Sequence, residues 1–141
     1  MTIAFIIPGR PTGKGRPKFA RRGAGVSTYT DAKTASYENK VAVFAQQAFV
    51  GIPAHTGAVE MTVIAYFKPP ASASKVAVER MLRGDPRTHP TVKPDFDNIV
   101  KAVLDGLNGI AFADDKQVTW VNGGKRYGLN DQVYVEIKED R

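Results

Sequence analysis

Carboxylates are concentrated in one short stretch of an otherwise basic chain. The 141-residue sequence carries a net charge of +6, yet five of its 14 acidic residues lie close together: Asp95, Asp97, Asp105, Asp114 and Asp115. Carboxylate oxygens are the ligands that hard cations such as Mg²⁺ prefer, and a basic surface attracts polyanions such as nucleic acid. A cation site that faces a polyanion is the simplest arrangement for a metal-dependent nuclease.

The first of these acids are positioned by a predicted helix that begins near Asp95 and ends near residues 108–109. Its apolar residues fall on one broad face that must be buried, namely Phe96, Ile99, Val100, Val103, Leu104 and Leu107. Asp97, Lys101 and Asp105 follow one another at intervals of four residues and therefore share a stripe beside that face. Asp95 takes the N-cap position, where the helix dipole stabilises carboxylates and phosphate oxygens.

Asp114 and Asp115 lie in a second segment, after enough chain to reverse its direction. A strand that follows them can return beside the helix start, so Asp95, Asp97 and one of this pair are placed to hold a divalent cation. Lys101 is placed to stabilise charge at phosphorus or to orient the attacking water. A helix cap, an Asp–Lys pair and an Asp-Asp turn are also common structural features, so spacing alone leaves a purely structural role open.

The remaining pattern predicts one α+β domain over residues 1–141, with a small mixed or antiparallel sheet packed by two main helices. Alternating apolar residues predict strands, and apolar residues three and four apart predict helices. The predicted strands are residues 2–7, 58–67, 117–121 and 132–138, the last two as a closing pair, and the predicted helices are residues 31–50, 72–83 and 95–108. Asp31 and Ser72 or Ser74 are the expected N-caps, and Gly51 and Gly84 the expected stops.

Residues 8–30 are predicted to form a long basic loop. Its cationic residues, together with Lys93, are the predicted contacts with DNA phosphates: Arg10, Lys14, Arg16, Lys18, Arg21 and Arg22. A solvated loop with no partner is the alternative, because a long loop can also be merely mobile. Phe19 and Tyr29 are candidates for stacking on bases, whereas Trp120 is expected in the core.

Composition excludes several classes of protein. The chain has no cysteine, which excludes disulfides and thiolate metal sites. No apolar run approaches the roughly 20 residues that a membrane-spanning helix needs, and the short apolar N-terminus lacks the basic segment of a signal peptide. We therefore expect a cytoplasmic protein with no membrane partner.

A longer pattern in the chain resembles a known family. The run Lys-Pro-Asp-Phe-Asp-Asn at residues 93–98 is followed by Lys101, Asp105, Leu107-Asn108-Gly109 and then Asp114-Asp115-x-Gln117-Val118. With the segments 8–17 and 29–38, this pattern resembles that of RusA-type Holliday junction resolvases, and the resemblance covers most of the chain in register. A pattern of this length is far more specific than any single pair of acids.

The resemblance implies a role for each matching position in a catalytic segment at residues 93–118. Asp95 and Asp97 match the paired metal-binding aspartates, and Lys101 matches the catalytic lysine. Asp115 matches the third catalytic aspartate, and Asp114 matches its neighbour at the metal. The resemblance further implies Mg²⁺ or Mn²⁺ as the cofactor with no small-molecule cofactor, a homodimer, and paired symmetric nicks across four-way-junction DNA.

Two departures from the family pattern leave every catalytic position in place. Lys93-Pro94 stands where some members carry arginines, and the segment between Asp97 and Asp115 is a residue shorter than in some members. Two other functions stay open. A non-catalytic protein that binds branched DNA would bind tightly without metal and never nick. A broader nuclease would also cut flaps or forks.

Overall fold

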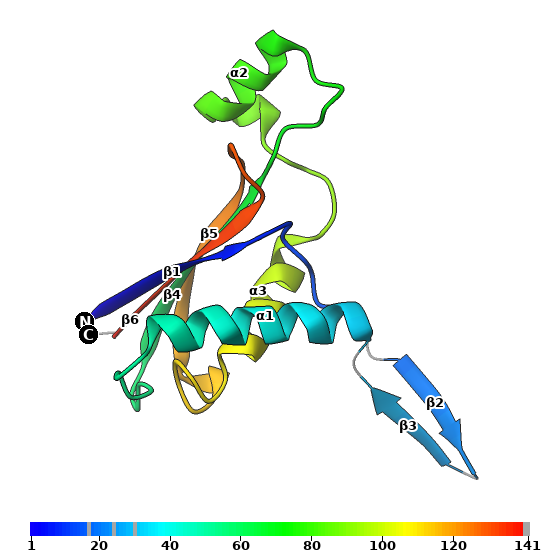
Figure 1. Ribbon diagram of the computed structural model, residues 1–141, viewed down its shortest axis with the longest axis vertical. Helices are drawn as coiled ribbons and strands as arrows, with labels where there is room; N and C mark the ends of the chain where they lie inside the picture. Colours follow the sequence, from blue (N-terminus) through cyan, green and yellow to red (C-terminus); the bar gives the residue numbers. More distant parts are fainter. Residues whose placement is uncertain (17, 24, 30, 140–141) are drawn as a thin grey trace.

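The computed structural model describes residues 1–16, 18–23, 25–29 and 31–139. Its strands are β1 (Thr2–Pro8), β2 (Lys18–Arg22), β3 (Gly25–Tyr29), β4 (Val59–Phe67), β5 (Val118–Tyr127) and β6 (Gln132–Glu139). Its α-helices are α1 (Ala32–Ala48), α2 (Lys75–Arg83) and α3 (Phe96–Leu107), and two short 3-10 turns are η1 (Pro86–Thr88) and η2 (Asp115–Gln117). Figure 1 shows the arrangement of these elements.

A four-stranded mixed sheet in the order β1-β6-β4-β5 forms the centre of the domain. Strand β6 runs antiparallel to both β1 and β4, whereas β5 runs parallel to β4. Every second residue of β4, from Val59 to Phe67, is buried, because successive side chains of a strand point to opposite faces. The predicted α+β class, with a small mixed sheet and two main helices, is confirmed.

Helices α1 and α3 lie beside each other and contribute to one continuous core with the sheet (Figure 1). Val41 of α1 and Val103 of α3 are fully buried. The two helices approach closely at Gly106, where a Cβ would lie 2.6 Å from Cβ of Val41 and 2.9 Å from the carbonyl oxygen of Glu38. The missing side chain at Gly106 therefore lets the last turn of α3 pack closely on α1.

The predicted loop at residues 8–30 is wrong in its second half. Residues 18–22 and 25–29 pair as an antiparallel hairpin, which extends away from the sheet and helices (Figure 1). The hairpin lacks the apolar face by which strands are recognised in a sequence, since its large apolar side chains Phe19, Val26 and Tyr29 are all exposed.

The predicted closing pair of strands is also wrong. β4 lies between β5 and β6, and β5 continues through Gly123 and Gly124, although paired glycines in a sequence are typical of turns. Gly123 has a φ of 136°, and a Cβ there would collide with the carbonyl oxygen of Val63. Trp120 is 60% exposed on this edge strand, so its predicted place in the core is wrong as well.

Three of the expected signals at helix ends are confirmed, whereas α1 ends at Ala48, with Phe49 as its C-cap, before the expected stop at Gly51. Asp31 caps α1, and Ser74 caps α2 through a hydrogen bond from the N–H of Ala77. Gly84 ends α2 with a φ of 78°, which glycine adopts without strain. Within the described ranges, we find no helix that is both long and apolar enough to cross a membrane.

Candidate active site

The loop between β1 and β2 lies across the starts of two helices. The N–H of Lys14 donates a hydrogen bond to the carbonyl oxygen of Asn98 on α3, at 2.9 Å. The N–H of Gly15 donates to Oγ1 of Thr34 on α1, at 2.8 Å. These two bonds hold one short piece of the basic loop on both helices.

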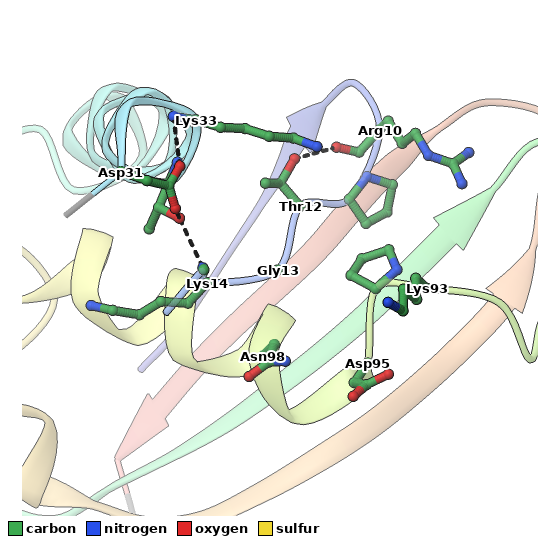
Figure 2. A pocket seen from close by; sticks show the side chains of 13 residues that line it. Arg10, Thr12, Gly13, Lys14, Asp31, Lys33, Lys93, Asp95 and Asn98 are labelled. Carbon is green, nitrogen blue, oxygen red and sulfur yellow. Dashed lines mark hydrogen bonds between the residues drawn. The ribbon is translucent and has the colours of Figure 1, made fainter. Parts of the chain in front are cut away.

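A groove of about 550 Å³ lies between this loop and the two helix starts, with Asp95 and Asn98 on the α3 side (Figure 2). More cationic than acidic side chains line it; the charged ones are Arg10, Lys14, Asp31, Lys33, Lys93 and Asp95. A groove with this lining attracts a phosphate, while one free carboxylate in its wall attracts a metal cation.

The predicted DNA contacts divide into two groups. The first surrounds the start of α3: Arg10, Lys14 and Lys93 line the groove, and Arg16 lines an adjoining hollow with Lys101. The second, Lys18 and Arg21, lies on the exposed hairpin, and the side chain of Arg22 lies outside the described residues. Cations from separate segments thus border the groove.

Asp31 and Asp95 occupy the same N-cap position on two helices but use their carboxylates differently. The Asp31 carboxylate accepts hydrogen bonds from the N–H groups of Lys33 and Thr34 and from the Thr34 hydroxyl, at 2.8 to 3.1 Å. Thr34 in particular holds the pKa of Asp31 below its usual value. Asp95 makes no such cap bond to α3. Its carboxylate is therefore not used to cap the start of the helix, and it lines the groove.

Asp97 and Lys101 lie one turn apart on the exposed side of α3. Nζ of Lys101 is 4.0 Å from Oδ2 of Asp97, and the two side chains are 61% and 72% exposed. An ion pair this open contributes little to stability. The Asp97 carboxylate therefore keeps oxygens free for another cation, and Lys101 is free to follow a ligand.

A charged cluster joins the basic loop to both helices. The Lys14 ammonium donates to the Asp105 carboxylate on α3 and lies 3.8 Å from Oε2 of Glu38 on α1. The hydrogen bond to Asp105 raises the pKa of Lys14, and burial raises the pKa of Glu38. Oε2 of Glu38 is buried and accepts no hydrogen bond from the described residues. Lys14 is thus held in an ion-pair cluster rather than left free for phosphate.

The neighbouring residues Asp114 and Asp115 have different surroundings. The Asp114 carboxylate accepts from the N–H of Lys116 at 2.9 Å and caps η2, and this bond lowers the pKa of Asp114. Gln117 accepts from the N–H of Asp114 and donates to the carbonyl oxygen of His55 at 2.8 Å, which ties the turn to the core. Burial raises the pKa of Asp115, and the carboxylates of Asp114 and Asp105 raise it further.

Comparison with known proteins decides which family this site belongs to. A family model described as "Endodeoxyribonuclease RusA" matches residues 8–138, which is nearly the whole chain. The chain is also 34% identical over 143 residues to the "Uncharacterized protein YqaN" of Bacillus subtilis (strain 168), covering 97% of this chain and 96% of that one. The chain belongs to the RusA family. Members of this family are endodeoxyribonucleases that act on branched DNA at Holliday junctions, so the suspected resemblance is confirmed.

The acids that match the RusA catalytic positions form two groups along α3. Asp95 and Asp97 are at its start, whereas Asp115 interacts with Asp105 near its end. Eight residues of helix separate Asp97 from Asp105, or about 12 Å along the axis. Over the described ranges, no three Asp, Glu or His side chains are close enough together to hold one cation.

Sequence reasoning missed several residues of this RusA-family site. Lys33 and Asn98 line the groove; both lie in segments that carry the family resemblance, but the resemblance gave neither a role. Glu38 joins the Lys14 cluster only because α1 packs on α3. Asp105 did carry a signal, since it shares the stripe of Asp97 and Lys101, although its partner could not be read from the spacing.

Proposed function

We propose that this RusA-family chain is a Mg²⁺-dependent endodeoxyribonuclease, with Mn²⁺ as a substitute, that resolves four-way DNA junctions by paired symmetric nicks as a homodimer. The observation that carries the proposal is the Asp95 carboxylate, which makes no cap bond to its own helix and lies in the wall of a basic groove. A carboxylate with a purely structural role would cap α3, as Asp31 caps α1.

The donor set at the start of α3 suits a hard cation. Asp95 and Asp97 are exposed and present carboxylate oxygens one turn from the positive end of the helix, and Mg²⁺ takes such ligands while it keeps several waters. Asp115 is the proposed third ligand; because it lies beside Asp105, near the other end of α3, the proposal requires its turn to move toward Asp95 and Asp97 when metal and DNA bind. Asp114 is proposed only as a weaker contributor, because its carboxylate already caps η2. The bound metal would polarise the phosphodiester and generate a hydroxide nucleophile.

The chain's own cations position the DNA. Arg10 stands 5.3 Å from the ring centre of Phe67, so its guanidinium is held in place before DNA arrives. Lys93 and Arg10 would bind backbone phosphates in the groove. Lys101 reaches along α3 from Asp97 and would stabilise the charge that develops at the scissile phosphate.

A dimer fits paired cleavage. Two sites related by a twofold axis present the same geometry to two symmetric strands, and a four-way junction has the same symmetry. The proposed homodimer therefore places one nick on each of two matching strands.

The test is cleavage of a labelled immobile four-way junction, with and without Mg²⁺, by the unchanged protein, by Asp97→Asn and by Glu79→Gln. Glu79 lies on α2, outside the groove, and its change removes the same charge. We expect symmetric paired nicks that need Mg²⁺, that Glu79→Gln preserves and that Asp97→Asn abolishes. Junction binding by Asp97→Asn should be equal or tighter, because it repels phosphate less. Mn²⁺ binding followed by electron paramagnetic resonance should weaken in Asp97→Asn alone.

Other outcomes assign other functions. Tight junction binding with no cleavage in Mg²⁺ or Mn²⁺ would identify a DNA-binding protein that lacks the family's activity. Equal cleavage of junctions, forks and flaps would identify the broader nuclease. Loss of both binding and cleavage in Asp97→Asn would show that Asp97 has a structural role.

A further inference from the structure

The β2–β3 hairpin is the part of the molecule that the active site does not explain. Its strands pair with each other from Lys18 opposite Tyr29 to Arg22 opposite Gly25, and neither strand joins the main sheet. It extends away from the body of the domain (Figure 1). An isolated two-stranded hairpin is marginally stable in water, so a hairpin held away from the core is expected to gain its order from a partner.

Each face of the hairpin places an aromatic ring beside a cation. Partners across an antiparallel pair share a face, as do residues two apart in one strand. Phe19 therefore shares one face with Arg21 and Val26, and Tyr29 shares the other with Lys18. Phe19 is 71% exposed and Tyr29 51% exposed. Large apolar side chains displayed together on the surface mark a binding site.

The chemistry of the hairpin favours single-stranded or unstacked nucleic acid. Residues 8–29 contain no acidic side chain, and the cations of the hairpin suit backbone phosphates. Aromatic rings interleaved with cations are typical of sites on which exposed bases stack. A fully paired duplex offers no free base face, because its bases stack on one another. The point where duplex arms meet is where a base face becomes available.

The position of the hairpin connects it with the groove. Its first strand follows Arg16, which lines the hollow beside Lys101, and its second strand leads to Asp31 at the start of α1. Lys18 is close enough to Asp31 to help lower the pKa of that carboxylate. Five residues of strand span about 17 Å, which exceeds the roughly 12 Å width of the DNA major groove. The hairpin thus starts beside the protein groove and is long enough to span a DNA major groove.

We propose that the β2–β3 hairpin recognises the branch point of DNA, with Phe19 stacked on a base that is unstacked there and with Lys18 and Arg21 on the adjoining phosphates. This inference rests on the proposed function, because it takes the branched DNA substrate as given. The hairpin would make the protein prefer junctions to duplexes, a preference that the carboxylates and the groove do not explain.

The test compares Phe19→Ala with Val50→Ala, which removes a comparably exposed apolar side chain beyond the end of α1 and outside the hairpin. Binding is measured in a chelator, so that no strand is cut, to a four-way junction and to a duplex of equal length. The junction carries 2-aminopurine at the branch point. The unchanged protein should prefer the junction and raise the 2-aminopurine fluorescence. Phe19→Ala should weaken junction binding on the order of 5- to 150-fold, change duplex binding less than about twofold, and lose the fluorescence rise.

Each variant has an expected result, and each contrary result has its own meaning. Phe19→Trp should restore junction binding and fluorescence, and Val50→Ala should match the unchanged protein. Equal junction affinity in Phe19→Ala, or equal losses on junction and duplex, would overturn the proposal while the proposed function stands. A dimer that dissociates in Phe19→Ala, seen by sedimentation, would overturn it in favour of contact between copies of the chain. No junction preference in the unchanged protein would overturn the proposed function itself.

Discussion

Replacing Gly106 by alanine tests whether the α1–α3 contact holds the site together. Two effects oppose each other. Alanine is the better helix former inside α3, by about 1 kcal/mol. The added Cβ, however, would lie 2.6 Å from Cβ of Val41 and 2.9 Å from the carbonyl oxygen of Glu38, whereas carbon atoms pack best at about 3.5 to 4.0 Å.

The steric effect is expected to dominate. The two helices must separate by about 1 Å to restore normal contact, and overpacking of this kind costs about 1–3 kcal/mol. A backbone oxygen and a β-branched Cβ cannot move aside as a flexible side chain can, so the upper end applies here. With the helix-propensity gain subtracted, Gly106→Ala should lose about 2 kcal/mol of unfolding free energy. For a chain of this length that lowers Tm by roughly 4–8 °C.

Urea denaturation and thermal melting, both followed by circular dichroism, measure these losses. Gly57→Ala is the matched control, because no heavy atom lies within 4 Å of a Cβ built at Gly57; its stability should change by less than about 0.5 kcal/mol. Junction nicking should also fall in Gly106→Ala, since the helix that carries Asp95 shifts against the loop on α1. If Gly106→Ala is as stable as the unchanged protein while the control behaves as expected, the helices do not pack as closely as described.

Three further predictions follow from single contacts. Burial raises the pKa of Glu38, so the stability that Glu38 contributes is present below its pKa in the unfolded chain and is lost as pH rises through its pKa in the folded protein. In urea titrations, the stability gained by Glu38→Gln over the unchanged protein should therefore be larger at pH 7 than at pH 4. The opposite trend would show that the ion pair with Lys14 dominates. Gly123→Ala should cost at least about 3 kcal/mol or prevent folding, because its Cβ would collide with Val63 in β4; a normal melting curve would contradict this. Arg16→Gln should reduce the slope of log affinity for junction DNA against log salt by about one unit, and an unchanged slope would remove Arg16 from the DNA interface.

Features that depend on near neighbours in the chain could be predicted from the amino-acid sequence. The caps at Asp31 and Ser74 and the stop at Gly84 follow from side chains that bond, or φ angles that are adopted, within a few residues. The apolar face of α3 and the alternation along β4 follow from periods of 3.6 and 2 residues. The family and the positions of its acids follow from a long pattern of residue types at set spacings.

Features that depend on which segments meet in space required the tertiary structure. The place of β5 beside β4, and not beside β6, depends on Gly123 passing close to the backbone of Val63, whereas glycine pairs in a sequence indicate turns. The sequence pattern does not predict the β2–β3 hairpin, because the hairpin buries no apolar face.

The candidate site shows the same division. Spacing placed Asp95, Asp97 and Lys101 at the start of one helix, and the structure agrees. Only the structure shows that the Asp95 carboxylate makes no cap hydrogen bond to α3, and that Lys14 bridges Asp105 and Glu38 across the packed helices. Side-chain direction and contacts between distant segments depend on how helices and strands pack, and that packing is decided by complementary surfaces of the whole chain and not by any local run of residues.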